Sequence, residues 1–314
     1  MISVIIPCKN RIDKLSECIE SIKEACDYAK KEFSRLIIEI IIINDHSEEG
    51  FSKIILDKFD YVKIFDSDKT GPGYARNFGI DKCSGDYIFF TDSDCVVSKD
   101  WILKGYKLFL KKDEIVIQGV PWLFQENINP NFGREEGKLY KIMFSKYLEG
   151  NYTSMTDSRN LLLNKKITNI LGKEVFSEKQ DKATAESRVF GKKCIAQGIN
   201  ILFDESIKIY HEDPRNMQDV CKQKYRHGYG RVMIWDSYPE YEYLSNRYFV
   251  NPIKHGIDKD YVLPAHASFL LGYYKHINNI EEYNKFMDFI TNVFKTYGKR
   301  IEDYPEFMEL VESE

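Results

Sequence analysis

Residues 1–120 alternate short apolar, β-branched runs with amphipathic stretches, and this alternation constrains the fold more than any other feature. The runs predict strands at Ser3–Pro7, Ile37–Asn44, Val62–Phe65, Tyr87–Thr91 and Ile115–Gly119. The stretches between them predict helices at Arg11–Phe33, Phe51–Phe59, Gly73–Cys83 and Lys99–Lys111. Parallel βαβ units have this pattern, and their connections are almost always right-handed. The sequence therefore predicts an α/β chain with a Rossmann-like, mostly parallel sheet.

The pattern changes after residue 120. Residues 124–132 are rich in Asn and read as a loop. Further helices are predicted at Arg134–Leu148 and Ala183–Gln197, a short strand at Ser158–Asn164, and two edge strands at Ile199–Phe203 and Ile207–His211. From Pro214 onward the chain reads as helical and aromatic-rich. We therefore divide it into segments 1–120, 121–213 and 214–314, the last being a helical C-terminal extension.

Charge and cysteine usage exclude several classes of protein. The net charge of −4 gives no electrostatic case for nucleic-acid binding. The seven Cys are odd in number and contain no Cys-x-x-Cys pair, which argues against a disulfide framework or a zinc site. The start of the chain lacks the features of a signal peptide, and no apolar stretch reaches the ~20 residues that span a bilayer. We expect a cytoplasmic protein, with any membrane contact peripheral, on the inner face.

Two carboxylates one residue apart, Asp92 and Asp94, directly follow the predicted strand Tyr87–Thr91. Ligands of open α/β sheets gather beyond the carboxyl ends of the strands, where Pro7 and Asp45 also lie. Two ionised carboxylates this close repel each other unless a cation lies beside them. Mg²⁺ and Mn²⁺ prefer oxygen ligands and leave positions open for substrate phosphates. The placement favours a metal site over a simple turn.

Several motifs in this half occur in the order found in one enzyme family. They are Ser3–Arg11 (an opening strand and loop), Ile43–Ser47 (an Asp-Asp-Gly-Ser-like turn, with Asn44 and His46 as departures), Gly71–Gly79 (Gly-x-x-x-Ala-Arg-Asn-x-Gly) and Gly85–Asp94 (the strand with the acidic triplet). Together they resemble the family-2 glycosyltransferases with the A-type fold. The resemblance implies a metal-dependent, inverting transfer of a sugar from a nucleotide-diphosphate donor, with Mn²⁺ or Mg²⁺ as cofactor.

The resemblance also implies residue roles at the donor site. Asp45 would accept a hydrogen bond from the base, which favours a uridine diphosphate sugar. Pro7 and Asn10 would line the nucleoside pocket. Arg76 would lie near the base or the diphosphate, Asp92 would contact the ribose, and Asp94 would bind the metal. Segment 1–120 would then hold the donor, and segment 121–213 would face the acceptor.

At the position of the family's general base, this sequence departs from the family's pattern. Residues 183–190 resemble the family's Glu-Asp helix start, which aligns Glu186 with the Glu and Ser187 with the catalytic Asp. We predict that Glu186 takes over as the base, with Asp181 as the nearest substitute. His211 follows the last predicted strand and matches a His that serves as a second metal or diphosphate ligand in relatives.

Gln223–His227 resembles the Gln-x-x-Arg-Trp motif of processive members, with His227 in the Trp place. The basic residues around it would meet the leaving diphosphate or an anionic acceptor, and Arg226 is the one we single out. The acceptor is left open among glycan, lipid-linked sugar and peptide. Two alternative functions also remain open: a sugar-phosphate nucleotidyltransferase, and a non-catalytic protein that binds nucleotide sugars or glycans.

Overall fold

A computed structural model describes residues 1–179, 186–237, 252–276 and 280–313. The chain divides into two compact units. Unit 1 comprises residues 1–125 and 144–212, and unit 2 comprises residues 126–143 and 213–314. The grouping of 126–143 with the C-terminal residues brings together segments that are far apart in the sequence. Each unit has its own hydrophobic core.

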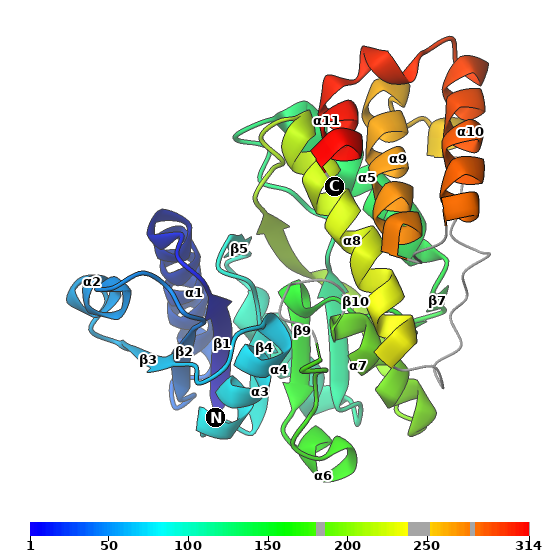
Figure 1. Cartoon of the computed structure of the whole chain (residues 1–314). Coiled ribbons are helices and arrows are strands. Elements are labelled where there is room, and N and C mark those ends of the chain that lie inside the picture. The colour runs from blue at the N-terminus through cyan, green and yellow to red at the C-terminus, as the bar shows by residue number, and fades with distance from the viewer. Residues whose placement is uncertain (180–185, 238–251, 277–279, 314) are drawn as a thin grey trace. The chain divides into compact units, whose positions relative to one another are not determined.

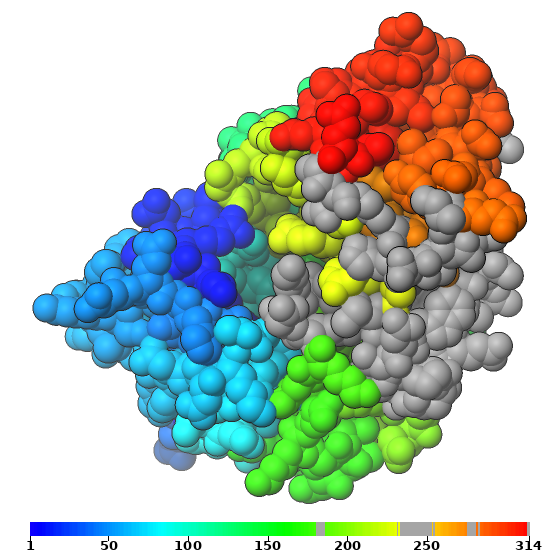
Figure 2. Space-filling model, in the orientation of Figure 1, coloured from blue at the N-terminus to red at the C-terminus, as the bar shows by residue number. Residues whose placement is uncertain are grey.

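The first half of the sheet in unit 1 is parallel (Figure 1). Its strands are β1 (Ile2–Cys8), β2 (Ile38–Asn44), β3 (Val62–Asp66) and β4 (Tyr87–Phe90), in the spatial order β3-β2-β1-β4. The connections are α1 (Ile12–Glu32), α2 (Phe51–Lys58) and α3 (Pro72–Lys82). At the β3 edge, α2 stands out on the surface (light blue in Figure 2). These elements confirm the predicted βαβ pattern.

The second half of the sheet mixes strand directions. β9 (Leu161–Asn164) lies antiparallel between β4 and β6 (Val116–Val120), and β6 pairs in parallel with β10 (Ile201–His211). The short strands β8 (Tyr152–Thr153) and β7 (Leu148–Glu149) complete that edge, and β5 (Cys95–Val97) pairs with β10. The other helices are α4 (Trp101–Lys111), α6 (Ile167–Leu171) and α7 (Glu186–Ala196). The predicted strand at Ser158–Asn164 begins as a 3-10 turn over Ser158–Asn160.

The prediction of two edge strands at Ile199–Phe203 and Ile207–His211 is wrong. The structure has one strand, β10, and it lies inside the sheet between β6 and β8. The polar residues Asp204, Glu205 and Ser206 read as a break in the sequence. They stay in the strand, where the pairing register with β6 shifts between Phe203 and Lys208. A bulge accommodates extra residues in this way without ending the strand.

Alternate residues of each strand face opposite sides of the sheet, and each side is covered by helices. In β1, Val4 and Ile6 pack with residues of α1, α2 and α4, whereas Ile5 packs with residues of α3, α6 and α7. β1, β2 and β4 are therefore buried on both faces. Burial on both faces explains their near-continuous apolar runs, and it leaves polar side chains to gather where the strands end.

Unit 2 is helical, as predicted for the C-terminal part (Figure 1). Its helices are α8 (Met217–Ser237), α9 (Lys259–His276), α10 (Ile280–Thr296) and α11 (Pro305–Ser313), with the first part of α5 (Pro130–Ser145). α9, α10 and α11 contribute to the orange and red surface in Figure 2. A buried cluster joins α5, α8 and α9, where Glu136 accepts from Lys224 and from Tyr261 Oη at 2.5 Å. Among the described residues, no helix has the length and apolar composition that a bilayer crossing requires.

Substitution of Gly228 by Ala is expected to destabilise unit 2. A Cβ at this position of α8 would lie 1.9 Å from the backbone oxygen of Phe269 in α9, which a side-chain rotation cannot relieve. Overpacking of this kind typically costs about 1–3 kcal/mol, more than Ala gains in helix propensity. Chemical denaturation should show this loss, and Lys222→Ala on the exposed face of α8 is the control. A Gly228→Ala protein as stable as the parent would contradict the close packing of α8 and α9.

Candidate active site

The carboxyl ends of β1, β2 and β4 bring the predicted donor-site residues to one edge of the sheet. Asp45 follows β2 directly, and Asp92 and Asp94 lie between β4 and β5. Asn10 follows β1, and its backbone N–H donates to Ser47 Oγ at 2.7 Å, while its side-chain oxygen accepts from Glu48 N–H at 2.9 Å. Asn10 therefore ties the loop after β1 to the loop after β2.

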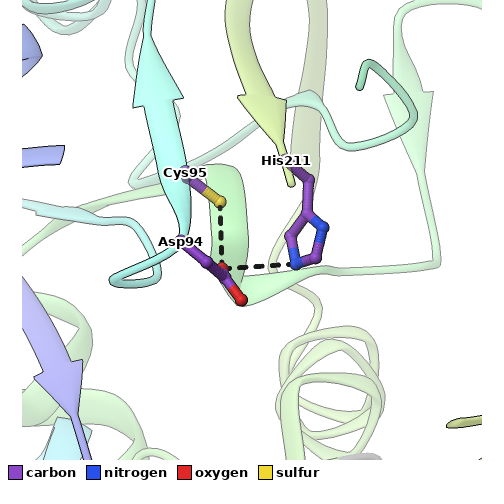
Figure 3. A group of neighbouring side chains, drawn as sticks. All are labelled: Asp94, Cys95 and His211. Atoms are coloured by element: carbon purple, nitrogen blue, oxygen red, sulfur yellow. Dashed lines mark hydrogen bonds and ion pairs between the residues drawn. The ribbon is translucent and has the colours of Figure 1, made fainter. Parts of the chain in front are cut away.

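Pairing of β5 with β10 places His211 beside Asp94 (Figure 3). His211 lies opposite Cys95 in the ladder, and its Nε2 is 3.3 Å from Asp94 Oδ1. The other ring nitrogen, Nδ1, lies 2.8 Å from the backbone oxygen of Glu212. A carbonyl oxygen can only accept, so Nδ1 carries the hydrogen. The lone pair of a neutral His211 then points from Nε2 toward a carboxylate oxygen, an arrangement that needs a proton or a cation between the two atoms.

The donor set of this pair fits a divalent cation. Protein histidines that bind metals commonly donate their second N–H to a backbone carbonyl, as His211 does. By distance alone, the Cys95 sulfur is also close enough to Asp94 and His211 to be a ligand. Burial raises the pKa of the Cys95 thiol well above its usual value, however, and a hard cation prefers oxygen. Among the described residues, Asp94 and His211 are therefore the side chains that could hold a divalent cation such as Mn²⁺ or Mg²⁺.

The charges around the pair act on both ligands. Burial favours a higher pKa for Asp94, but His211, Arg11 and Arg159 hold it below its usual range. Burial favours a lower pKa for His211, and Asp94 more than offsets this, so the pKa of His211 is raised. Asp94 is therefore ionised at neutral pH. The neighbouring carboxyl differs, because burial raises the pKa of Asp92 against the opposing effect of Arg76.

Arg76 lies at the centre of a second charged group. Its Nη1 donates to Glu186 at 2.7 Å, and its Nη2 donates to Asp92 at 2.8 Å. Arg76 and Glu186 are both buried, and the guanidinium also lies over the ring of Phe176, 5.8 Å from its centroid. The first turns of α3 thus place Arg76 between Asp92 and Glu186, the first residue of α7.

Asp45 is held by the start of α3. Both of its carboxylate oxygens accept from the backbone N–H of Gly71, at 3.3 and 3.1 Å. His46 Nδ1 lies 3.4 Å from Oδ1. Gly71 has a φ of 115°, a backbone conformation that other residues rarely adopt, which accounts for glycine at this turn. The carboxylate keeps lone pairs that can accept from a ligand.

Two predicted site residues are not placed with the others. Arg226 lies on the exposed side of α8, in unit 2, so its predicted role remains a prediction. Asp181 falls outside the described residues. Pro7 is within β1, in register with Ile43 of β2, close to the end of the strand as predicted.

Sequence reasoning missed four charged residues beside the triplet. Arg11 donates from Nη1 to Asp94 Oδ2 at 2.7 Å and from Nη2 to Glu212. Arg159 holds Asp157 with two nitrogens, at 2.9 and 2.8 Å, and its charge acts on Asp94 and His211. Arg11 stands in the opening motif, so its position gave a usable signal. Asp157 and Arg159 reach the site through the 3-10 turn before β9, and no sequence motif marks this turn.

Comparison with known proteins agrees with this architecture. The family described as "Glycosyl transferase family 2" matches residues 3–170. An uncharacterized glycosyltransferase of Rickettsia felis is 34% identical over 152 residues, which are 48% of this chain and 22% of that protein. The chain thus matches about a fifth of the length of the first curated relatives.

Two solved structures show the same fold at low sequence identity. The mannosyltransferase PcManGT from Pyrobaculum calidifontis, in complex with GDP-Man and Mn²⁺, has a TM-score of 0.54 at 14% identity, covering 86% of this chain and 72% of that one. GalNAc-T7 with UDP, GalNAc and Mn²⁺ has a TM-score of 0.51 at 15% identity, covering 83% and 54%. The predicted A-type glycosyltransferase fold is confirmed.

Proposed function

The chain belongs to glycosyl transferase family 2, and we propose that it moves a sugar from a uridine-diphosphate donor to an acceptor hydroxyl with inversion, assisted by a divalent cation. The observation that carries the proposal is that Asp94 and His211 face each other. Oδ1 of Asp94, which follows β4, lies 3.3 Å from Nε2 of His211, the last residue of β10. Two solved structures with this fold hold a nucleotide or nucleotide sugar together with Mn²⁺, which supports the same use here.

Each charged group has a part in this reaction. A divalent cation held by Asp94 and His211 would neutralise the charge that develops on the leaving diphosphate. Asp92, which accepts from Arg76 at 2.8 Å, would accept from a ribose hydroxyl of the donor. Glu186 is the proposed base and takes the proton of the acceptor hydroxyl as that oxygen attacks the anomeric carbon. Arg76 fixes the position of Glu186 in the resting enzyme, at 2.7 Å.

The nucleotide preference is a testable consequence of Asp45. Its carboxylate can accept from uracil N3–H, whereas the N3 of cytosine carries no hydrogen. We expect UDP to bind more tightly than CDP by ~1–3 kcal/mol, the cost of leaving a buried acceptor without its donor. Calorimetric titration of both nucleotides, with Asp45→Asn as the comparison, measures this difference. Equal affinity of the parent protein for UDP and CDP would remove Asp45 from base recognition.

A screen of nucleotide sugars by thermal shift, with and without Mn²⁺, tests the proposal as a whole. A uridine-diphosphate sugar should stabilise the protein in the presence of Mn²⁺, and transfer to an acceptor should release UDP. Release of pyrophosphate from UTP and a sugar phosphate would indicate a nucleotidyltransferase instead. Binding without transfer in glycan, lipid-linked and peptide acceptor mixtures would indicate a binding protein. Family membership and the assembled acidic site favour the transferase.

A further inference from the structure

Arg11 forms an ion pair with Asp94, the carboxylate that the proposed metal ion would also bind. Its Nη1 donates to Asp94 Oδ2 at 2.7 Å, and its Nη2 donates to Glu212. The other oxygen of Asp94 faces His211. The Arg11 side chain is 38% exposed, against 14% for Asp94 and 7% for Glu212. The guanidinium therefore bridges two largely buried acids, and it belongs to a side chain that is itself partly exposed to solvent.

The backbone directs Arg11 to this position at some cost. Asn10 and Arg11 have φ angles of 58° and 62°, in the left-handed region. Asn tolerates this region, but for Arg it costs about 1–2 kcal/mol, and such strain gathers at functional sites. The hydrogen bonds of Asn10 to Ser47 and Glu48 hold the strained turn in place. The chain thus enters α1 by a route that puts Arg11 over the end of β4.

A cation that arrives alone must compete with this guanidinium. If Arg11 stays in place, a divalent ion between Asp94 and His211 adds two positive charges beside the existing one. If Arg11 leaves Asp94, the ion pair is lost. A cation that arrives with a nucleoside diphosphate brings negative charge of its own, which can pair with the released guanidinium.

Resting on the proposed metal site, we propose that Arg11 is an intrinsic counter-cation of Asp94 that couples metal binding to diphosphate binding. It occupies Asp94 in the nucleotide-free protein and so keeps the affinity for free Mn²⁺ low. When cation and diphosphate bind together, the ion pair between Arg11 and Asp94 breaks. Arg11 keeps its ion pair with Glu212 and forms a new one with the diphosphate. The function of this exchange is to admit the cation chiefly as part of the donor complex.

The neighbouring cations do not fit this role. Lys14 is 3.9 Å from Glu212 and pairs with Glu17 at 3.1 Å, and no contact joins it to Asp94. Arg159 is engaged by Asp157 through two hydrogen bonds. Lys14→Gln is therefore a matched control, because it removes a positive charge next to Glu212 but leaves the Asp94 pair intact.

The experiment is a titration of the full chain with Mn²⁺, followed by the electron paramagnetic resonance signal of free Mn²⁺, with and without saturating UDP. We expect UDP to tighten Mn²⁺ binding strongly in the parent protein. Arg11→Gln should tighten nucleotide-free Mn²⁺ binding and so reduce the effect of UDP by about tenfold, within the usual range of coupling between two ligands. Lys14→Gln should leave the effect of UDP at its parental value.

The outcomes separate this proposal from the proposed function. An effect of UDP that is as large in Arg11→Gln as in the parent overturns the role of Arg11 and leaves the metal site standing. Weaker Mn²⁺ binding in Arg11→Gln both with and without UDP also overturns it, because Arg11 would then only support the site. Mn²⁺ binding that Asp94→Asn does not weaken overturns both the metal site and the role of Arg11.

Discussion

Asp94→Ala is expected to abolish transfer and donor hydrolysis while the protein remains folded. Asp94 supplies the oxygen ligand of the proposed metal pair, and its loss leaves His211 as the one protein ligand of that pair. A bound cation is worth several kcal/mol to a reaction whose leaving group is a diphosphate. At about 1.4 kcal/mol for each tenfold change in rate, turnover should fall by about a thousandfold or more. Transfer and hydrolysis assays with added Mn²⁺ measure this fall.

The fold should tolerate the loss of Asp94. The residue follows β4 at a strand end and belongs to neither hydrophobic cluster of unit 1. Arg11 keeps Glu212, and His211 Nδ1 keeps the Glu212 carbonyl oxygen. Asp86→Ala is a suitable control, because Asp86 is an exposed carboxylate at the opposite end of β4, paired with the N-terminal amine at 3.1 Å. Full activity of Asp94→Ala after treatment with a chelator would refute the metal assignment.

Glu186→Gln should lower turnover by about 10²–10⁴-fold and leave donor affinity nearly unchanged, because a positioned base contributes this much to proton removal. The amide keeps the size of the side chain, and its oxygen can still accept from Arg76. In the proposed mechanism the donor is held by Asp45, Arg76 and the metal pair. Single-turnover kinetics and UDP titration separate the two quantities. Glu178→Gln is a nearby control, since Glu178 accepts from Asn77 at 2.8 Å and has no predicted role in the chemistry.

Restoring the family's residue tests the same assignment from the other side. Ser187→Asp should recover part of the lost turnover in the Glu186→Gln background, because Ser187 follows Glu186 at the start of α7. If Glu186→Gln retains near-normal turnover and Asp181→Asn does not, the alignment of this helix is wrong. If neither change matters, the acceptor is a thiol that attacks with little help from a base, or the chain does not catalyse the transfer.

The sequence by itself determined the parallel half of the sheet and most of its helices. Strands buried on both faces must be almost wholly apolar, so β1, β2 and β4 were visible as runs. The same physics left Asp45, Asp92 and Asp94 conspicuous as the polar residues that follow those runs. The family resemblance rested on these positions, and the match over residues 3–170 confirms it.

Only the tertiary structure decided which charges meet. His211 reaches Asp94 because β5 pairs with β10, and Arg76 reaches Glu186 across 110 positions of sequence. Periodicity reports the burial of a residue in its own strand or helix, but it carries no information on pairing between distant segments. For this reason the sequence predicts two strands in place of β10, because the polar stretch at 204–206 resembles a turn. Arg11 likewise became part of the site only when the end of β4 and Glu212 were brought to it.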